Sequence, residues 1–215
     1  ETYPEYIPCV LLQMTLVAFS DIIQIAREWN SDGLLKSFVL SNIHGLSPNF
    51  INGVKTVDYE ETKQLYLHIL DAYEKHQDWV VLKIFLDECL AYWKDRPIID
   101  AGQSVPMATC MPINSKIYID SQMQIGICEK VADKYRIGNV KNGIDWKRAN
   151  EIVEEYYHKR VERCKYCPAI RMCDMCLTAV EYSDEQWDIL CHNERVYAQI
   201  FMFLYCEMAE RGLIK

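Results

Sequence analysis

The sequence lacks any cluster of basic residues. It has 31 acidic residues against 23 basic ones, which gives a formal net charge of −8. Nucleic acids and anionic membranes are bound through basic surfaces, so we expect neither as a partner. The sequence also lacks internal repeats and low-complexity linkers. Half of its 215 residues are apolar, which is enough to build one large domain or two smaller ones around a core.

A membrane-spanning segment and a signal peptide are absent as well. The apolar run CVLLQMTLVAF at residues 9–19 is too short to cross a bilayer. It follows Glu1 and Glu5, whereas a signal peptide begins with basic residues. We therefore expect a buried strand or the start of a helix at this position, and a protein of the reducing cytoplasm.

Cysteine, in contrast, is abundant, with ten in the chain. Disulfides belong to oxidising compartments and mainly stabilise chains too small to build a core, and this chain is not that small. The cysteines therefore need another explanation.

The first hundred residues alternate short apolar runs with helical patterns. LLKSFVLSNIHG predicts a strand that ends in a loop at Gly45. The next segment starts with a capping box, Asp58 to Glu61, and has helical periodicity through residue 76. The apolar segment at residues 78–95 is compatible with a helix or with a buried strand. This alternation of strand-like and helical segments predicts an α/β (α+β) fold. We expect a first domain over residues 1–100 and a second over 101–215.

The second domain has a different character. KIYIDSQMQIGIC, residues 116–128, alternates like a β-hairpin that turns near Ser121–Gln122. A short extended piece with a turn follows, and Asp145 is placed to cap a helix that leads to Cys164. A second capping box lies at residues 183–186, and we expect a long helix from about Glu194 to Gly212.

Seven cysteines form an ordered series across this second domain. Two of them bracket the hairpin, the middle four read C-x-x-C-x5-C-x-x-C, and one follows later; they are Cys110, Cys128, Cys164, Cys167, Cys173, Cys176 and Cys191. Thiolates two residues apart can ligate the same metal centre, which is why C-x-x-C is found in zinc and iron–sulfur sites alike.

Three interpretations are compatible with the series. A zinc ribbon would use the middle four cysteines, but zinc sites usually separate their two pairs by about a dozen residues or more, and three cysteines would have no role. A disulfide framework is disfavoured by the expected reducing compartment. Iron–sulfur ligation accommodates all seven cysteines in two clusters, because each cubane takes about four thiolates.

The order of these motifs resembles the SPASM domain, the C-terminal extension of radical S-adenosylmethionine enzymes that modify ribosomally made peptides and proteins. The resemblance rests on IYIDSQMQIGIC, the following IGNV, the helix into RCKYC and the last cysteine. It covers residues from about 104 to 195. More loosely, FVLSNIHG and the helix at residues 58–76 resemble the last strands and helices of the partial TIM-type barrel in that family.

The resemblance implies two auxiliary [4Fe–4S] clusters. By matching positions, one would be ligated by Cys164, Cys167, Cys173 and Cys191. The other would be ligated by Cys110, Cys128 and Cys176. Some members supply its fourth ligand at the position of Ser104, so an open iron site is implied here, with Cys89 as a fallback ligand. Zinc remains the alternative metal, in a non-catalytic interaction module.

The sequence departs from the family pattern in three places. The glycine that usually lies five positions before the second cysteine is Met123, and Gly126 is close to it. The last pair is C-x-x-C rather than C-x3-C, which bears on the assignment of Cys176. The C-x3-C-x-x-C motif for the catalytic cluster is absent, and about a hundred residues are too few for a partial barrel. We therefore expect the C-terminal part of a longer enzyme, which would not be catalytic alone.

Several other residues have two interpretations. Arg160, Arg163 and Lys165 either offset the negative charge of a thiolate-bound cluster or are solvated cations at a helix end. Cys9, Cys89 and Cys206 lie in apolar contexts and are expected to be buried. Gly45 either approaches S-adenosylmethionine or only makes a turn.

The resemblance implies a function in peptide or protein modification by radical chemistry. This region would relay an electron and position the substrate through its two clusters. The full-length enzyme would add S-adenosylmethionine and a third [4Fe–4S] cluster. Its partners would be a peptide or protein substrate with a leader sequence and an external electron donor.

Overall fold

The structure is a computed structural model that describes residues 9–14, 22–31, 37–42, 56–94, 117–129, 131, 133–170, 172–173 and 175–214. The described elements form two compact units. Unit 1 contains β1, α1, β2, α3, α4 and the part of α6 from Val196 onward. Unit 2 contains β3–β6, α5, the 3₁₀ helices η2 and η3, and the part of α6 up to Arg195.

Unit 1 begins with a βαβ arrangement. Strand β1 (Cys9–Met14) pairs in parallel with β2 (Ser37–Asn42), and α1 (Ile22–Ser31) connects them. The predicted strand that ends near Gly45 is thus present as β2, whereas Gly45 itself lies outside the described residues. In the described part of the chain β1–β2 is the one parallel pair, so the α+β class is established and no barrel is seen there.

The helices of unit 1 build its core. Asp58 is the N-cap of helix α3 (Tyr59–Lys75). Its Oδ1 accepts a 2.8 Å hydrogen bond from Glu61 N, as the capping motif predicts. The segment that the sequence left undecided is a helix, α4 (Val80–Lys94). Both helices bury their apolar faces against α1 and the end of α6. The main buried side chains of this core are Ile22, Tyr66, Ile69, Leu70, Leu82, Leu86, Leu90, Ile200 and Leu204.

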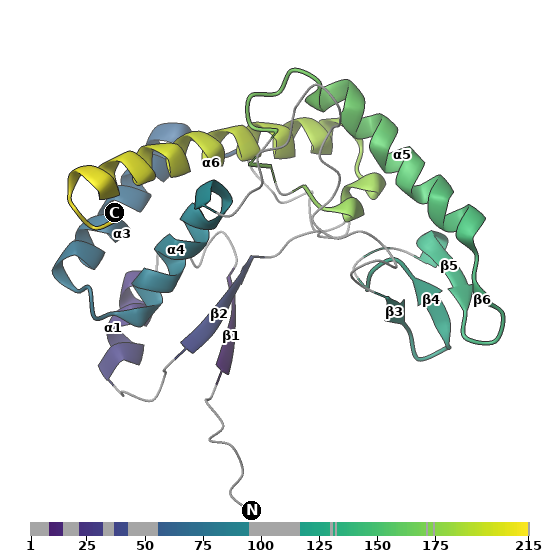
Figure 1. The fold of residues 1–215 in the computed structure, drawn as a ribbon, viewed down its shortest axis with the longest axis horizontal. Helices are drawn as coiled ribbons and strands as arrows, with labels where there is room; N and C mark the ends of the chain where they lie inside the picture. The colour runs from purple at the N-terminus through teal and green to yellow at the C-terminus, as the bar shows by residue number, and fades with distance from the viewer. Residues whose placement is uncertain are drawn as a thin grey trace, which may run out of the picture. The chain divides into compact units, whose positions relative to one another are not determined.

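Unit 2 contains a four-stranded antiparallel sheet in the order β3-β4-β5-β6 (Figure 1). Its strands are β3 (Tyr118–Ile119), β4 (Gln124–Gly126), β5 (Arg136–Asn139) and β6 (Gly143–Ile144), with η2 (Asp133–Tyr135) before β5. The predicted hairpin is confirmed, because β3 pairs with β4 around Ser121–Gln122. The predicted extended piece with a turn forms β5 and β6.

Helix α5 (Trp146–Cys164) follows the sheet directly. Asp145 caps it, since Arg148 N donates a 2.9 Å hydrogen bond to Asp145 Oδ1. Its buried face lies against η3 (Leu177–Glu181) and β5. Burial of this apolar face fixes the direction of α5 and so places Cys164, its last residue, at the edge of the core of unit 2.

Helix α6 (Asp184–Glu210) begins ten residues before the predicted start. The capping box at its beginning is reciprocal: Ser183 N donates to Gln186 Oε1 at 2.8 Å, and Gln186 N donates to Ser183 Oγ at 3.3 Å. At its other end Gly212 has a φ of +68° and Leu213 N donates to Met208 O, as in a glycine-terminated helix. Among the described helices, none combines the length and the apolar character of a bilayer-crossing segment.

Candidate metal centre

The candidate site in unit 2 starts at the end of α5. Cys164 is buried there, and Cys167 N donates a 3.0 Å hydrogen bond to Cys164 O, which closes a turn around the first C-x-x-C. After that turn, Cys173 N donates a 2.9 Å hydrogen bond to Ala169 O. Successive turns therefore keep the segment from Cys164 to Cys173 on a short loop beside the helix end.

Three thiols predicted to share one cluster lie within electrostatic range of one another. The pKa of Cys191, on α6, is raised to about 11, chiefly by burial and next by the neighbouring Cys164, with Cys167 adding to the rise. The pKa of Cys164 is also raised, mainly by burial, and Cys167 again adds to the rise. Charges influence one another's pKa only at short range, so these thiols, from the end of α5, the loop after it and α6, are near enough to affect one another's ionisation.

Arg160 lies on α5, one helical turn before Cys164. Its side chain is fully buried. Its Nη1 donates to Tyr156 Oη at 2.5 Å and to Met175 O at 3.1 Å. Tyr156 Oη itself donates to the same carbonyl at 2.8 Å. These bonds fasten α5 to the loop that carries Cys173 and Cys176, because Met175 lies between those two cysteines.

The remaining donors of Arg160 are close to Cys164. Its Nε and Nη2 are buried without a hydrogen bond of normal geometry in the described part of the chain, but the guanidinium acts on Cys164 as a charge and as a hydrogen-bond donor, and both effects lower the pKa of that thiol. Burial lowers the pKa of Arg160, but Tyr156 and Cys173, with a smaller contribution from Cys164, raise it to a net value above the ordinary one. The guanidinium therefore lies within range of two of the predicted ligand thiols, on different segments.

Cys176 lies beside Tyr156 and Tyr182. It occupies the residue before η3, and Ala179 N donates to Cys176 O at 3.0 Å. Burial is the main cause that raises the pKa of Tyr156, and both Cys173 and Cys176 add to it. Burial likewise raises the pKa of Tyr182 to about 12, with a contribution from Cys176. The assignment of Cys176 to a different cluster from Cys173 stays a prediction.

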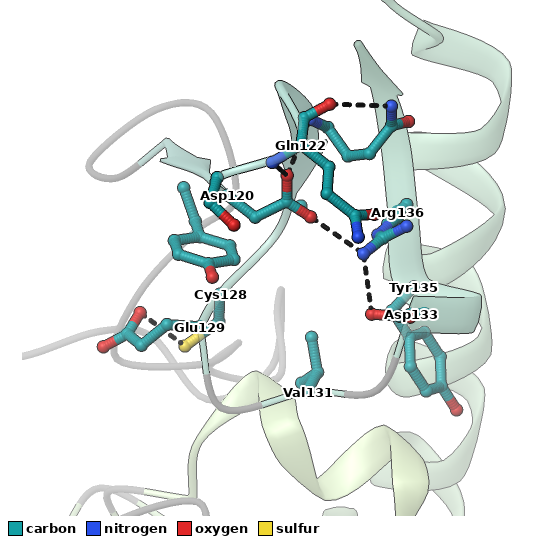
Figure 2. Close-up of a pocket in the computed structure, with 12 residues that line it drawn as sticks. Asp120, Gln122, Cys128, Glu129, Val131, Asp133, Tyr135 and Arg136 are labelled. Atoms are coloured by element: carbon teal, nitrogen blue, oxygen red, sulfur yellow. Dashed lines mark hydrogen bonds and ion pairs between the residues drawn. The ribbon is translucent and has the colours of Figure 1, made fainter.

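Cys128 lines a separate pocket of about 240 Å³ next to the hairpin. Its Sγ donates to Glu129 Oε2 at 3.3 Å. Figure 2 shows these two residues across the pocket from Arg136, which binds Asp120 at 2.8 Å and Asp133 at 3.0 Å. Asp120 Oδ1 also accepts hydrogen bonds from two backbone amides of the turn. The sequence analysis missed this Asp120–Arg136 pair, whose signal is an Asp at the start of a hairpin turn.

The chemistry of the donor set, rather than the arrangement of the described side chains, suits a thiolate-bound metal group. Cysteine sulfurs are the ligands that iron–sulfur clusters and structural zinc share. A buried guanidinium is costly in an apolar interior, whereas a thiolate-bound group would supply both negative charge and sulfur acceptors. In the described ranges, no three His, Cys, Asp or Glu side chains are already arranged to hold one ion.

The structure resolves some of the alternatives for the other residues. Arg160 is not a solvated cation, because it is fully buried, while Lys165 is exposed. Arg163 is partly buried and its Nη2 pairs with Asp184 Oδ1 at 2.6 Å. Cys89 is buried in the core of unit 1, as expected, but the expectation for Cys206 is wrong, since it is exposed on α6.

Other predicted site residues lie outside the described part of the chain. These are Cys110 and Ser104 of the second cluster and Gly45 of the proposed S-adenosylmethionine contact; the side chain of Cys9 is likewise not described.

We compared the chain with protein-family models, with curated proteins and with solved structures, and found no match in any of the three comparisons.

Proposed function

We propose that unit 2 binds two auxiliary [4Fe–4S] clusters and belongs to a radical S-adenosylmethionine enzyme that modifies a ribosomally made peptide or protein. Cys164, Cys167, Cys173 and Cys191 hold one cluster; Cys110, Cys128 and Cys176 hold the other, with an open site near Ser104. Unit 1 is the C-terminal portion of the partial barrel of that enzyme. The S-adenosylmethionine, which Gly45 would contact, and the third cluster belong to the full-length enzyme.

One observation supports the proposal: thiols from the end of α5, the loop after it and α6 influence one another's pKa, and two of them influence that of a buried arginine. Cys164, Cys167 and Cys191 interact with one another, and Arg160 interacts with Cys164 and Cys173. The resemblance assigns these same four cysteines to one cluster. Bound clusters supply a route for the electron that leaves the substrate after hydrogen abstraction. The residues of this chain hold the thiolates in place.

Metal and sulfide analysis of the anaerobically prepared protein tests the proposal. We expect about eight iron and eight acid-labile sulfide per chain, because each cubane contains four of each, together with broad visible absorption that bleaches on reduction. The double variant Cys164→Ser/Cys191→Ser should retain about half of both. Cys206→Ser is the matched control, since Cys206 is exposed in unit 1, and it should retain all of both.

Two results would contradict the proposal. One zinc ion per chain without sulfide would instead support a zinc-binding interaction module. If Cys206→Ser lost as much iron as the double variant, the assignment of Cys164 and Cys191 as cluster ligands would be wrong. Two further observations test the finer claims: Ser104→Cys should alter the spectrum of the second cluster, and the coding region upstream of residue 1 should encode C-x3-C-x-x-C.

A further inference from the structure

The pocket of about 240 Å³ in unit 2 lies on one face of the four-stranded sheet. A row of paired residues on three strands lines it: Tyr118 on β3 pairs with Gly126 on β4, and Gly126 pairs with Arg136 on β5. Paired residues in neighbouring strands point to the same face of a sheet. The adjacent residues Ile125 and Ile137 are buried in the core of unit 2 instead. The pocket is therefore on the face of the sheet that does not form the core.

Gly126 leaves a hollow in the middle of this row. A Cβ at this position would lie 3.3 Å from Cδ1 of Tyr118, so the absence of a side chain makes room beside the aromatic ring. The pocket is smaller than the clefts of about 300–1,000 Å³ that hold drug-sized ligands. Its size therefore suits a single side chain or a small molecule rather than a large cofactor.

The charged side chains on the Arg136 side of the hollow have an excess of negative charge. Asp120 Oδ2 and Asp133 Oδ1 both bind Arg136 Nη2, at 2.8 and 3.0 Å. Two carboxylates bound to one guanidinium leave one negative charge unbalanced. Glu129 supplies a third carboxylate across the pocket from Arg136 (Figure 2). A cation in the hollow would thus have carboxylates on one side and the ring of Tyr118 on the other.

We propose that this pocket binds a primary alkylammonium group, which is carried by a lysine side chain of a peptide or by a small free amine. The ammonium lies over Gly126 near Asp120 and Asp133, and its alkyl chain contacts the ring of Tyr118. Both carboxylates and aromatic rings attract an ammonium group. The inference does not depend on the proposed clusters, because no cysteine takes part in this binding.

Calorimetric titration of the 215-residue protein with two amino-acid derivatives tests the proposal. N-acetyl-lysine N-methylamide should bind. N-acetyl-norleucine N-methylamide has a similar alkyl chain without the ammonium and should not. n-Butylammonium distinguishes the two sources of the group: binding at least as tight as that of the lysine derivative assigns the pocket to a small free amine, and weaker binding assigns it to a lysine side chain.

Two substitutions test the residues of the pocket. Asp133→Asn removes the unbalanced charge and keeps the pair of Asp120 with Arg136. Tyr118→Leu removes the aromatic ring. We expect each to weaken binding by about two- to fivefold. Glu162→Gln is the matched control, since Glu162 is an exposed carboxylate on α5 outside the pocket, and it should leave the affinity unchanged.

A second measurement uses the unaltered protein and does not depend on the folding of a variant. In the ¹⁵N-labelled chain, the lysine derivative should shift the amide signals of Gln124 and Gly126, which line the pocket, and the norleucine derivative should not. The proposal is wrong if the lysine derivative does not bind, if the norleucine derivative binds equally well, or if the shifted signals lie outside the pocket. It is also wrong if Asp133→Asn and Tyr118→Leu both bind as the control does.

Discussion

Some residues of unit 2 have backbone conformations or surroundings that lower the stability of the fold unless other interactions compensate for them. Met123, in the turn between β3 and β4, has a φ of +60° and is the one non-glycine residue with positive φ in the described part of the chain. Side chains other than glycine are disfavoured there by about 1–2 kcal/mol. Val140 N donates to Met123 O at 2.9 Å, which holds the residue in place against β5.

Replacing Met123 with glycine should therefore stabilise the hairpin. The side chain is 61% exposed, so its removal loses little burial. We expect the free energy of unfolding to rise by about 1 kcal/mol, measured by urea unfolding with tryptophan fluorescence. Gln122→Gly at the neighbouring exposed position should lower stability by roughly 0.5–1 kcal/mol. Equal effects of the two substitutions would show that the backbone of Met123 is not strained.

The sequence predicted some of these residue-level features and not others. The resemblance to the SPASM pattern leads one to expect glycine at position 123, and Met123 has a positive φ, a conformation that glycine adopts more easily. The assignment of Cys164, Cys167, Cys173 and Cys191 to one cluster, which the resemblance implies, stays a prediction. The burial of Arg160 did not follow, because the pattern of α5 alone does not show that η3 and the cysteine loop cover this side of the helix. Cys206 was mistaken for a core residue since its neighbours in sequence are apolar.

At the scale of elements, the predictions that depend on short-range signals were the accurate ones. The caps at Asp58, Asp145 and Ser183 all form as expected, because each involves residues three positions apart. The start of α6 was placed ten residues too late, since its first turns carry polar residues that looked like a loop. For α4, an all-round apolar sequence does not distinguish a helix from a buried strand, and only packing against α1, α3 and α6 decides.

The β5–β6 turn provides a prediction at this scale. Gly138 has a φ of +143°, and a Cβ added to it would lie 2.2 Å from Gly143 O. Gly138→Ala must therefore displace β6 from β5. Gly143 has a φ of +80°, but a Cβ there would meet nothing within 4 Å. Gly143→Ala should cost only the conformational penalty of about 1 kcal/mol.

Hydrogen exchange measures the difference between these two variants. We expect Gly138→Ala to lose protection at Asp145 N, which donates to Ile137 O at 2.7 Å, and at the other amides of the pair. Gly143→Ala should retain it. If both variants keep full protection, the close approach of the two strands is not required for the sheet.

At the scale of the whole molecule, the chain has two hydrophobic cores. The two units that contain them do not coincide with the predicted domains at residues 1–100 and 101–215. Residues from Val196 onward belong to unit 1, together with α1, α3 and α4. Their buried side chains, such as Ile200 and Leu204, join the core built by α1, α3 and α4. Sequence order alone does not predict that the last helix completes the first unit, because that depends on long-range packing.

Both units contain buried tyrosines, and their burial makes the free energy of unfolding depend on pH in the alkaline range. Tyr66 of unit 1 is 3% exposed, and burial, with a smaller effect of Cys89, raises its pKa well above the ordinary value. Burial also raises the pKa of Tyr135 in unit 2. In the unfolded chain these groups ionise near pH 10. Above that pH the unfolded state binds fewer protons than the folded state, so the free energy of unfolding falls as pH rises.

The stabilising contribution of Tyr66 is thus fully present below about pH 10 and is lost above it. We expect the free energy of unfolding to decrease by up to about 1.4 kcal/mol per pH unit for each such tyrosine, measured by urea unfolding from pH 9 to 11 with tyrosine ionisation followed by absorbance. Tyr66→Phe should make this decrease less steep. Tyr205→Phe, an exposed position on α6, is the control and should leave the slope unchanged. If Tyr66→Phe also leaves the slope unchanged, Tyr66 ionises in the folded state and its burial does not govern alkaline unfolding.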